Sequence, residues 1–545
     1  LFRRVSAALL PVTVVLLSVI ATFGCMGHLG LPFTSITQIL PIFLLAVGVC
    51  DAVHILSIAY LRRAAGDDRE TAIVAALEHS GLAVVLTSLT TAGGLASLMA
   101  AEISPVAQLG MIAPLGVLLA LFYSLLLLPA LLAVAPMPAP RGNAQGVAGP
   151  VTAALVRMAD LSTRRPRAVL AATGFVLLLA IPGILQLRFG NHPLEWLFED
   201  DPVRLAIERI DRAFEGTTAV EILIDSGVEN GLHDPELLGR IERAMAFATA
   251  LREGPVSVGK AISIVDIVKE INQALHENQA AHFVLPDGRS LIAQELLLFE
   301  NSGSDDLGDV ADSLFREGRV TLQASQADGM HYVVFLETLE AGFREILGED
   351  IDIQITGGMA LVSRTFSLLL TSLVRSYALA LLIITPLMVL LVGDLRRGLL
   401  SMIPNLIPVY LTLALMGGLG IPMSIGTLLI GSIVIGVAVD DTIHFMHKFI
   451  RYSEETDDPR EAVRRTFATT GTALLTTSLV LATSFMIYVT AHFYSLIHFG
   501  ILAGFATIVA FLADVLTAPA LMVLAGPRFP GAKHSANKET RPRVA

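Results

Sequence analysis

Ten runs of the sequence are apolar and long enough to cross a membrane, and they constrain the fold more than any other feature. A helix needs about 20 apolar residues to cross the ~30 Å hydrocarbon layer. The runs lie near residues 7–27, 36–60, 80–100, 107–135, 167–187, 376–393, 398–418, 425–447, 470–490 and 496–525. Hydrophobic residues make up 54% of the 545 residues and charged residues 16%, which is too little polar surface for a water-soluble protein. We therefore expect a membrane all-α bundle of ten spans.

The loops between these runs differ in their basic charge. Four loops contain no Lys or Arg, near residues 28–35, 101–106, 417–424 and 491–495. The other loops and the ends carry the basic residues Arg3, Arg4, Arg62, Arg63, Arg164, Arg165, Arg167, Arg396, Arg397, Lys448, Arg451 and those between 528 and 543. Basic loops stay on the cytoplasmic side. We therefore expect a multi-pass inner-membrane protein whose large domain is periplasmic.

These patterns divide the chain into six predicted segments. They are a first transmembrane repeat of four spans (1–138), a cytoplasmic linker (139–165), a single span (166–187), an extracytoplasmic porter-like domain (188–365), a second transmembrane repeat of five spans (366–526) and a basic cytoplasmic tail (527–545). The extracytoplasmic domain holds 32 acidic and 14 basic residues. Binding to nucleic acid needs concentrated basic charge, so we expect no nucleic-acid partner.

The two cysteines limit the possible metal and redox chemistry. Cys25 and Cys50 are the only cysteines and lie in apolar runs, so we expect no disulfide framework, thiolate metal site or cofactor.

The sequence contains an internal repeat. A gapless shift of 390 positions matches the sequence to itself over roughly 130 residues, which indicates a duplication into parallel repeats. Its matches include Gly30 with Gly420, Asp51 with Asp441, His54 with His444, Asp68 with Asp458, Gly81 with Gly471, Thr87 and Ser88 with Thr477 and Ser478, Gly110 with Gly500, and Pro129 with Pro519. By the same logic we expect roughly 220 further residues ahead of Leu1, and twelve spans in all.

Each repeat carries an Asp and a His three positions apart at mid-membrane depth. Asp51 and His54 share one helix face, as do Asp441 and His444. Asp440 adds a second carboxylate, and adjacent carboxylates in a medium of low dielectric do not both ionise easily. Ionisable groups at the bilayer centre cost at least ~2.5 kcal/mol each and usually mark ion pathways. We predict that these five residues form a proton relay, because histidine titrates near neutrality.

Other interpretations of these residues stay open. The pairs could be buried ion pairs that fix helix packing, or ligands of a divalent ion, although HExxH is absent and we expect no metal. Four hydroxyl residues in the following spans would hydrogen-bond between helices or support the relay: Thr87, Ser88, Thr477 and Ser478. Four further ionisable residues have no repeated partner: Glu102, His492, His498 and Asp514. We expect these four to be solvated at the membrane interface.

Residues 188–365 have the pattern of a mixed α/β domain. Apolar alternation predicts strands at 219–225, 319–325, 331–337 and 351–357. Helical spacing predicts helices at 234–252, 306–316 and 339–347. This mixture suggests split βαβ units, so we expect an inserted extracytoplasmic α/β (ferredoxin-like) domain.

Two motifs resemble a known family. GVAVDDTIHFMHKFIRY (436–452), the weaker AVGVCDAVHILSIAYLRR (46–63), and a domain ahead of the second bundle resemble the RND superfamily of exporters. The likeness is closest to the MMPL type and the third hydrophobe/amphiphile-efflux type, whose membrane unit is like a sterol-sensing domain. It implies a secondary active transporter, not an enzyme, which exports hydrophobic or amphiphilic, lipid-like molecules by proton antiport.

Carried over by position, the resemblance places the relay on Asp440, Asp441 and His444, with Asp51 and His54 from the other half. Thr477 or Ser478 would support it. Cys50 stands where the second repeat has Asp440, so we expect the second half to handle more of the protons.

The resemblance also bears on partners. The extracytoplasmic domain is too short for the docking module of the drug-efflux branch, so we expect no outer-membrane channel partner. A dimer or trimer of the chain is compatible with the family. The alternatives are a sterol-sensing-like sensor or assembly factor without transport, and an accessory motor for protein translocation, since both have similar membrane units.

Overall fold

The computed structural model describes residues 5–134, 149–190, 192–303, 306–456 and 458–526. The chain divides into two compact units. We call residues 1–188 with 369–545 the helical unit, and residues 189–368 the sheet unit.

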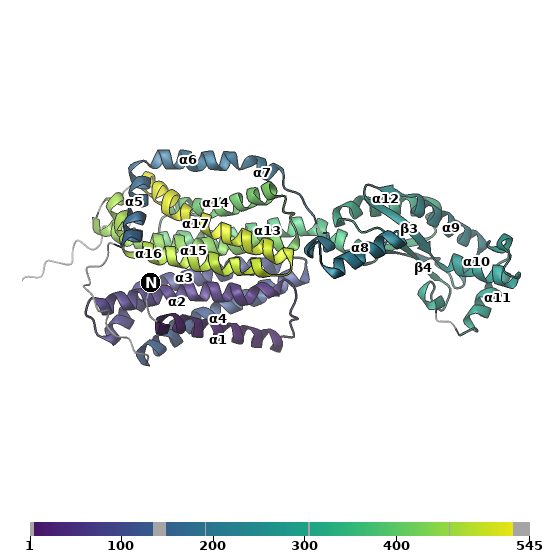
Figure 1. Ribbon diagram of the computed structural model, residues 1–545, viewed down its shortest axis with the longest axis horizontal. Coiled ribbons are helices and arrows are strands. Elements are labelled where there is room, and N and C mark those ends of the chain that lie inside the picture. Colours follow the sequence, from purple (N-terminus) through teal and green to yellow (C-terminus); the bar gives the residue numbers. More distant parts are fainter. Residues whose placement is uncertain (1–4, 135–148, 191, 304–305, 457, 527–545) are drawn as a thin grey trace, which may run out of the picture. The chain divides into compact units, whose positions relative to one another are not determined.

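Long helices make up the helical unit (Figure 1). They are α1 (Val5–His28), α2 (Leu40–Ala64), α3 (Arg69–Ala96), α4 (Ser104–Val134), α5 (Pro150–Arg164), α6 (Pro166–Leu179), α7 (Ile181–Leu185), α13 (Gly358–Val392), α14 (Leu395–Leu419), α15 (Ile425–Thr456), α16 (Pro459–Met486) and α17 (Tyr494–Ala525). The first turns of α13, up to residue 368, are counted with the sheet unit. Within the described residues, ten helical stretches are long and apolar enough to cross a membrane, with α6 and α7 counted as one. The ten predicted spans are confirmed, and the chain is a membrane protein.

The helices α3 and α16 are capped at their N-termini by aspartates that match each other at the 390-residue shift. The Asp68 side chain accepts a hydrogen bond from Thr71 N at the start of α3, and Asp458 accepts one from Arg460 N at the start of α16. Such caps satisfy backbone N–H groups that have no partner within the helix. Part of the predicted cytoplasmic linker is helical: residues 150–164 form α5, which packs against α16 and α17.

The helices form two clusters that meet along four central helices. α1 to α4 pack on one another, as do α14 to α17, while α3 contacts α15 and α2 contacts α16 (Figure 1). α3 and α15 approach closely because glycines face each other: a Cβ built on Gly94 would lie 3.3 Å from the Cα of Gly436. Thr91 Oγ1 also donates to the carbonyl of Gly436 at 3.1 Å. The two halves of the helical unit are therefore joined through α2 and α3 of the first half and α15 and α16 of the second.

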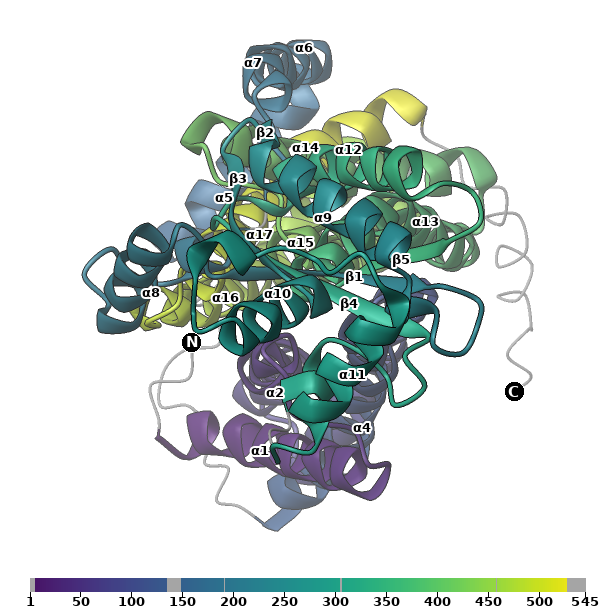
Figure 2. The ribbon, with the colours of Figure 1, turned by 90° about the vertical axis from the view of Figure 1, so that its right-hand side faces the viewer.

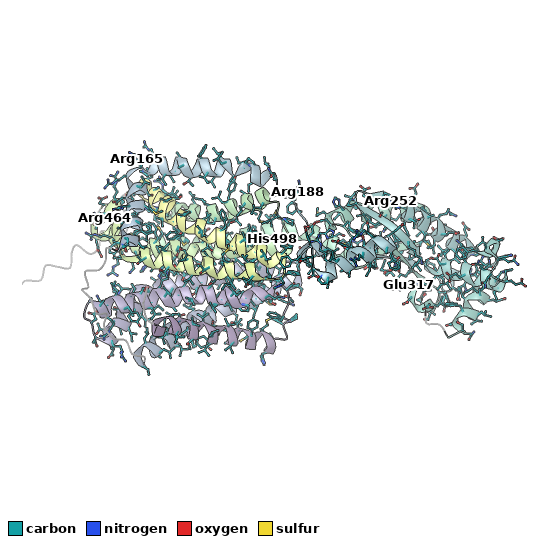
Figure 3. The ribbon with its side chains drawn as sticks, in the orientation of Figure 1. Arg165, Arg188, Arg252, Glu317, Arg464 and His498 are labelled. Atoms are coloured by element: carbon teal, nitrogen blue, oxygen red, sulfur yellow. The ribbon has the colours of Figure 1, made fainter. Side chains whose placement is uncertain are left out.

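Four labelled residues mark the two ends of the helical unit. Figure 3 labels Arg165 and Arg464 at one end, and Arg188 and His498 at the other. The first end, where α2 and α15 finish and α3 and α16 begin, also holds Arg62 and Lys448. We call it the basic end.

The sheet unit holds one five-stranded sheet with helices (Figure 2). Its elements are α8 (Pro202–Phe214), β1 (Thr218–Asp225), α9 (Pro235–Ala250), β2 (Arg252–Glu253), β3 (Val256–Ile262), α10 (Ile264–Leu275), α11 (Arg289–Glu300), β4 (Glu317–Ala324), α12 (Gly329–Leu347) and β5 (Asp352–Thr356). The strand order is β2-β3-β4-β1-β5, and each strand pairs antiparallel with its neighbours. Alternate residues of β1, Val220, Ile222 and Ile224, are buried in the core with residues of α9 and α12.

Two of the elements predicted for the sheet unit are wrong. Residues 331–337 form part of α12 and not a strand, because Asp328 caps the helix at Met330 N and the buried Tyr332, Phe335 and Leu339 recur at helical spacing. The helix predicted at 306–316 is a short 3₁₀ helix, Asp306–Asp309, followed by an isolated bridge from Ala311 to Gly318.

Candidate functional site

The predicted relay residues lie on the two central helices, α2 and α15. Asp51 and His54 on α2 are buried, as are Asp440, Asp441 and His444 on α15. The buried faces of both helices arise because they pack against α3 and α16 rather than against lipid. The structure therefore removes all five ionisable side chains from solvent.

Hydroxyl groups from α3 hold the carboxylate of Asp51. Ser88 Oγ donates to Oδ2 at 2.8 Å, and Thr87 Oγ1 lies 3.5 Å from Oδ1. The hydroxyl of Thr87 has a single hydrogen, and the carbonyl of Val84 in its own helix is a nearer acceptor, 3.0 Å away. Ser88 is therefore the main donor to Asp51.

The second half repeats this arrangement. Ser478 Oγ on α16 donates to Asp441 Oδ2 at 2.5 Å, and Thr477 Oγ1 lies 3.3 Å from Oδ1. Thr477 donates to the carbonyl of Leu474 at 2.8 Å, as its counterpart does in α3. Both carboxylates thus accept hydrogen bonds from neutral hydroxyls and have no Lys or Arg partner within the described residues.

The two halves meet at their histidines. The rings of His54 and His444 are stacked, with centroids 3.6 Å apart and planes inclined by 15°. Asp440 Oδ1 lies 3.7 Å from His444 Nε2, which is longer than a hydrogen bond. Cys50, at the position that matches Asp440, lies with its Sγ 3.7 Å from the carbonyl of Thr477. The site is therefore shared between the halves but differs in charge on its two sides.

One expectation about single ionisable residues is wrong. Asp514 on α17 is not solvated at an interface but is 2% exposed, and its Oδ1 lies 2.6 Å from Thr442 Oγ1. Thr442 Oγ1 also lies 2.9 Å from Asn405 Oδ1. Because the hydroxyl has one hydrogen, one of these contacts needs a hydrogen from Asp514 or from the Asn405 amide. Glu102 and His492 are exposed and His498 is half-buried.

Sequence reasoning therefore missed a fourth buried carboxyl, next to the site. Asp514 lies in the middle of an apolar run, and that depth was the signal that could have identified it. Asn405 and Thr442 offered no comparable signal, because uncharged polar residues are common in membrane helices.

The cluster reaches space on one side much more than on the other. A cavity of about 360 Å³ at the basic end reaches His54 and His444. Beside Asp441, a hollow of about 10 Å³ is lined mainly by apolar side chains, among them Phe485 and Leu481. A single water molecule needs about that volume.

Comparison with known proteins agrees with this picture. The sequence model of the MMPL family matches residues 1–169 and 332–545, which include every residue of the Asp and His cluster. The chain belongs to the MMPL family. This confirms the resemblance to the MMPL branch of the RND superfamily predicted from the two motifs.

A relative of this MMPL chain comes from an archaeon. The chain is 32% identical over 133 residues to the membrane protein MJ1562 of Methanocaldococcus jannaschii. The match covers 24% of this chain and 34% of that protein, so the chain spans about a third of the length of the curated relative that it matches.

Proposed function

We propose that the protein is a secondary active transporter of the inner membrane that exports hydrophobic or amphiphilic, lipid-like molecules by proton antiport. Membership of the MMPL family supports the transporter class. The observation that carries the proposal is the pair of buried carboxylates, Asp51 and Asp441, together with the stacked histidines of the same two helices. Burial of so many ionisable groups in a membrane protein is costly and usually serves ion movement.

The hydrogen bonds suit a proton relay better than a structural ion pair. A structural pair would set each carboxylate against a cation, whereas Asp51 and Asp441 accept from serine hydroxyls. A neutral donor allows the carboxylate to gain and lose a proton without leaving a cation buried and unpaired. Asp440, 3.7 Å from His444, supplies a second carboxyl on the more acidic side.

Unequal access to the cluster supports alternating access. Proton antiport requires that the acids face one side of the membrane at a time. The cavity at the basic end reaches the histidines, whereas the hollow beside Asp441 has room for about one water molecule. We assign the basic end to the cytoplasm by the positive-inside rule, so this conformation would exchange protons with the cytoplasm.

Two further features support the predicted architecture. Asp68 and Asp458 cap equivalent helices, and Ser88 and Ser478 make equivalent bonds, as duplication into parallel repeats requires. In the sheet unit, β1, β3, β4 and β5 with α9 and α12 follow a β-α-β-β-α-β connectivity, which supports a ferredoxin-like domain. We infer that this domain is periplasmic and handles the substrate.

Substitution of Asp441 tests the proposed coupling. Asn has nearly the same shape but carries no ionisable proton, so we expect Asp441→Asn to lower proton-dependent transport of a labelled lipid in proteoliposomes at least tenfold. Glu102→Gln removes an exposed carboxylate of the same unit and should transport normally. Undiminished transport by Asp441→Asn would contradict the proposal.

A double variant, in which Asp51 and Asp441 are both replaced by Asn, separates transport from the sensor alternative. A sensor or assembly factor without transport would keep its partner binding and cellular phenotype when Asp51 and Asp441 are both replaced by Asn. A transporter would lose the phenotype together with transport. A lipidomic comparison of the deletion strain with its parent would then identify the class of cargo.

A further inference from the structure

The cavity at the basic end is built from matching positions of the two halves. His54 and His444 lie at its inner end, and its other walls include the matched pairs Ser57 with His447, Ile58 with Lys448, His79 with Thr469, and Ser80 with Thr470. The cavity therefore lies where α2, α3, α15 and α16 meet. Its chemistry is uneven, because the second half supplies an ammonium and an imidazole where the first supplies Ile58 and Ser57.

The residues that line this cavity are basic or neutral. Lys448 is only 8% exposed, and four histidines share the space with it: His54, His79, His444 and His447. No Asp or Glu belongs to the described lining residues. An ammonium group taken this far out of water is costly unless an anion or several acceptors compensate its charge.

The nearby acidic groups do not provide that compensation. Glu455, about two turns beyond Lys448 along α15, lies 3.8 Å from Arg451 and 3.9 Å from Arg465. Asp440 lies beside His444 at 3.7 Å and is not among the lining residues.

Unused hydrogen-bonding atoms lie at the inner end. Nε2 of His54 and Nε2 of His444 are buried and have no hydrogen-bond partner in the described part of the chain. Both side chains are more than nine-tenths buried, so bulk water does not compensate them. His79 Nδ1 donates to the carbonyl of Ala75 at 2.8 Å, so Nε2 of the neutral ring is an acceptor.

We propose that this cavity binds an oxyanion of the phosphate class, either free phosphate or the phosphate head group of a lipid. The Lys448 ammonium supplies the charge, the hydroxyl of Ser80 supplies a neutral donor, and Nε2 of His79 accepts from a phosphate hydroxyl. The hydroxyl hydrogens of Ser57 and Thr470 go to the carbonyls of Val53 and Thr466, so these two residues present only oxygen to the cavity. Lysine is a common phosphate ligand because its ammonium is a compact charge with three donors. Lys448 and His79 lie outside the proton relay, so this binding does not depend on the proposed transport.

Phosphate binding by the purified full chain tests this assignment. Titration calorimetry in detergent, with chloride at equal ionic strength as the reference, should show saturable binding of inorganic phosphate. Lys448→Gln should weaken the affinity at least tenfold, and His79→Asn should weaken it several-fold. Arg451→Gln removes one charge at the same end but outside the cavity, and should change the affinity less than twofold.

A lipid arm distinguishes the two sources of phosphate. The protein is placed in nanodiscs of phosphatidylcholine with or without phosphatidic acid, and retained lipid is counted by native mass spectrometry. Retention of phosphatidic acid that depends on Lys448, without binding of free phosphate, would assign the site to a head group. The proposal is overturned if neither arm shows binding, or if binding is the same in Lys448→Gln and His79→Asn as in the wild type. His79→Asn also keeps the test decisive should Lys448→Gln not fold.

Discussion

Gly110 near the start of α4 tests the packing of the helical unit. A Cβ at this position would lie 2.4 Å from the backbone nitrogen of Met99 and 2.7 Å from the carbonyl carbon of Leu98. Ordinary contacts of this kind are longer by about 1 Å. Because these are backbone atoms, no side-chain rotation can relieve the overlap, and α4 would have to move away from the end of α3.

The size of the effect follows from two opposing contributions. Forcing a methyl group into a packed interior costs about 1–3 kcal/mol, and contact with backbone atoms favours the upper part of that range. Replacement of Gly by Ala within a helix contributes about 0.5–1 kcal/mol of stability. For Gly110→Ala we therefore expect a net destabilisation of about 2 kcal/mol, roughly a 30-fold change in the folding equilibrium.

The matched control is Gly81→Ala in α3, because a Cβ there meets no atom within 4 Å. It should stabilise the protein by about 0.5–1 kcal/mol. Both variants are compared with the wild type by denaturation in mixed micelles, followed by circular dichroism. The reasoning is refuted if Gly110→Ala is as stable as Gly81→Ala.

The matching position of the second half extends the test. A Cβ on Gly500 would lie 2.6 Å from the carbonyl oxygen of Phe485 and 2.8 Å from Cβ of Tyr488. Gly500→Ala should therefore be destabilising to a similar degree as Gly110→Ala. A neutral effect at Gly500 alone would contradict the equivalence of the two halves.

Two further predictions concern the pH dependence of the sheet unit, measured by hydrogen exchange of the full chain. The carboxyl oxygens of Glu295 are buried and have no partner in the described residues, and this burial raises the pKa of Glu295. The contribution of the protonated carboxyl to stability is therefore present below about pH 4.3 and is lost as the pH rises through the raised pKa. Glu295→Gln should flatten that decline in the protection of α11, and an unchanged decline would contradict the assignment. The guanidinium of Arg316 lowers the pKa of Asp225 to about 2, so this stabilisation is present above about pH 3.9 and is lost as the pH falls toward 2. Arg316→Gln should reduce this acid-dependent loss in β1, because only the hydrogen bond from Gly227 N then remains to lower the pKa of Asp225, and an unchanged loss would show that another pair is responsible.

The spacing of residues along one helix could be predicted, but the neighbours of that helix could not. Three positions separate Asp51 from His54, which was enough to place both on one face. The stacking of His54 on His444 depends on α2 and α15 being adjacent, and no local pattern specifies that contact. The same limit applies to Asp514, whose partner Thr442 lies on another helix.

Strand prediction failed for a related physical reason. β3 was not predicted, because its alternation holds only from Val256 to Val258 and the register of its pairing with β4 shifts before Lys260. Residues 331–337 have apolar side chains at spacings that fit both a strand and a helix. Their cap at Asp328 and their burial on one helical face favour the helix.

The unequal charges of the two halves have a physical explanation in their packing. If the halves arose by duplication, matching residues that face each other at their junction meet their own counterparts, as His54 and His444 do at 3.6 Å. Two like charges about 4 Å apart repel by roughly 4 kcal/mol at an effective dielectric constant of 20, so identical ionised residues would oppose folding there. Replacement of one member removes such repulsion, and the chain has Cys50 at the position that matches Asp440 and Ile58 at the position that matches Lys448. The imidazoles can remain identical because neutral rings stack without that cost.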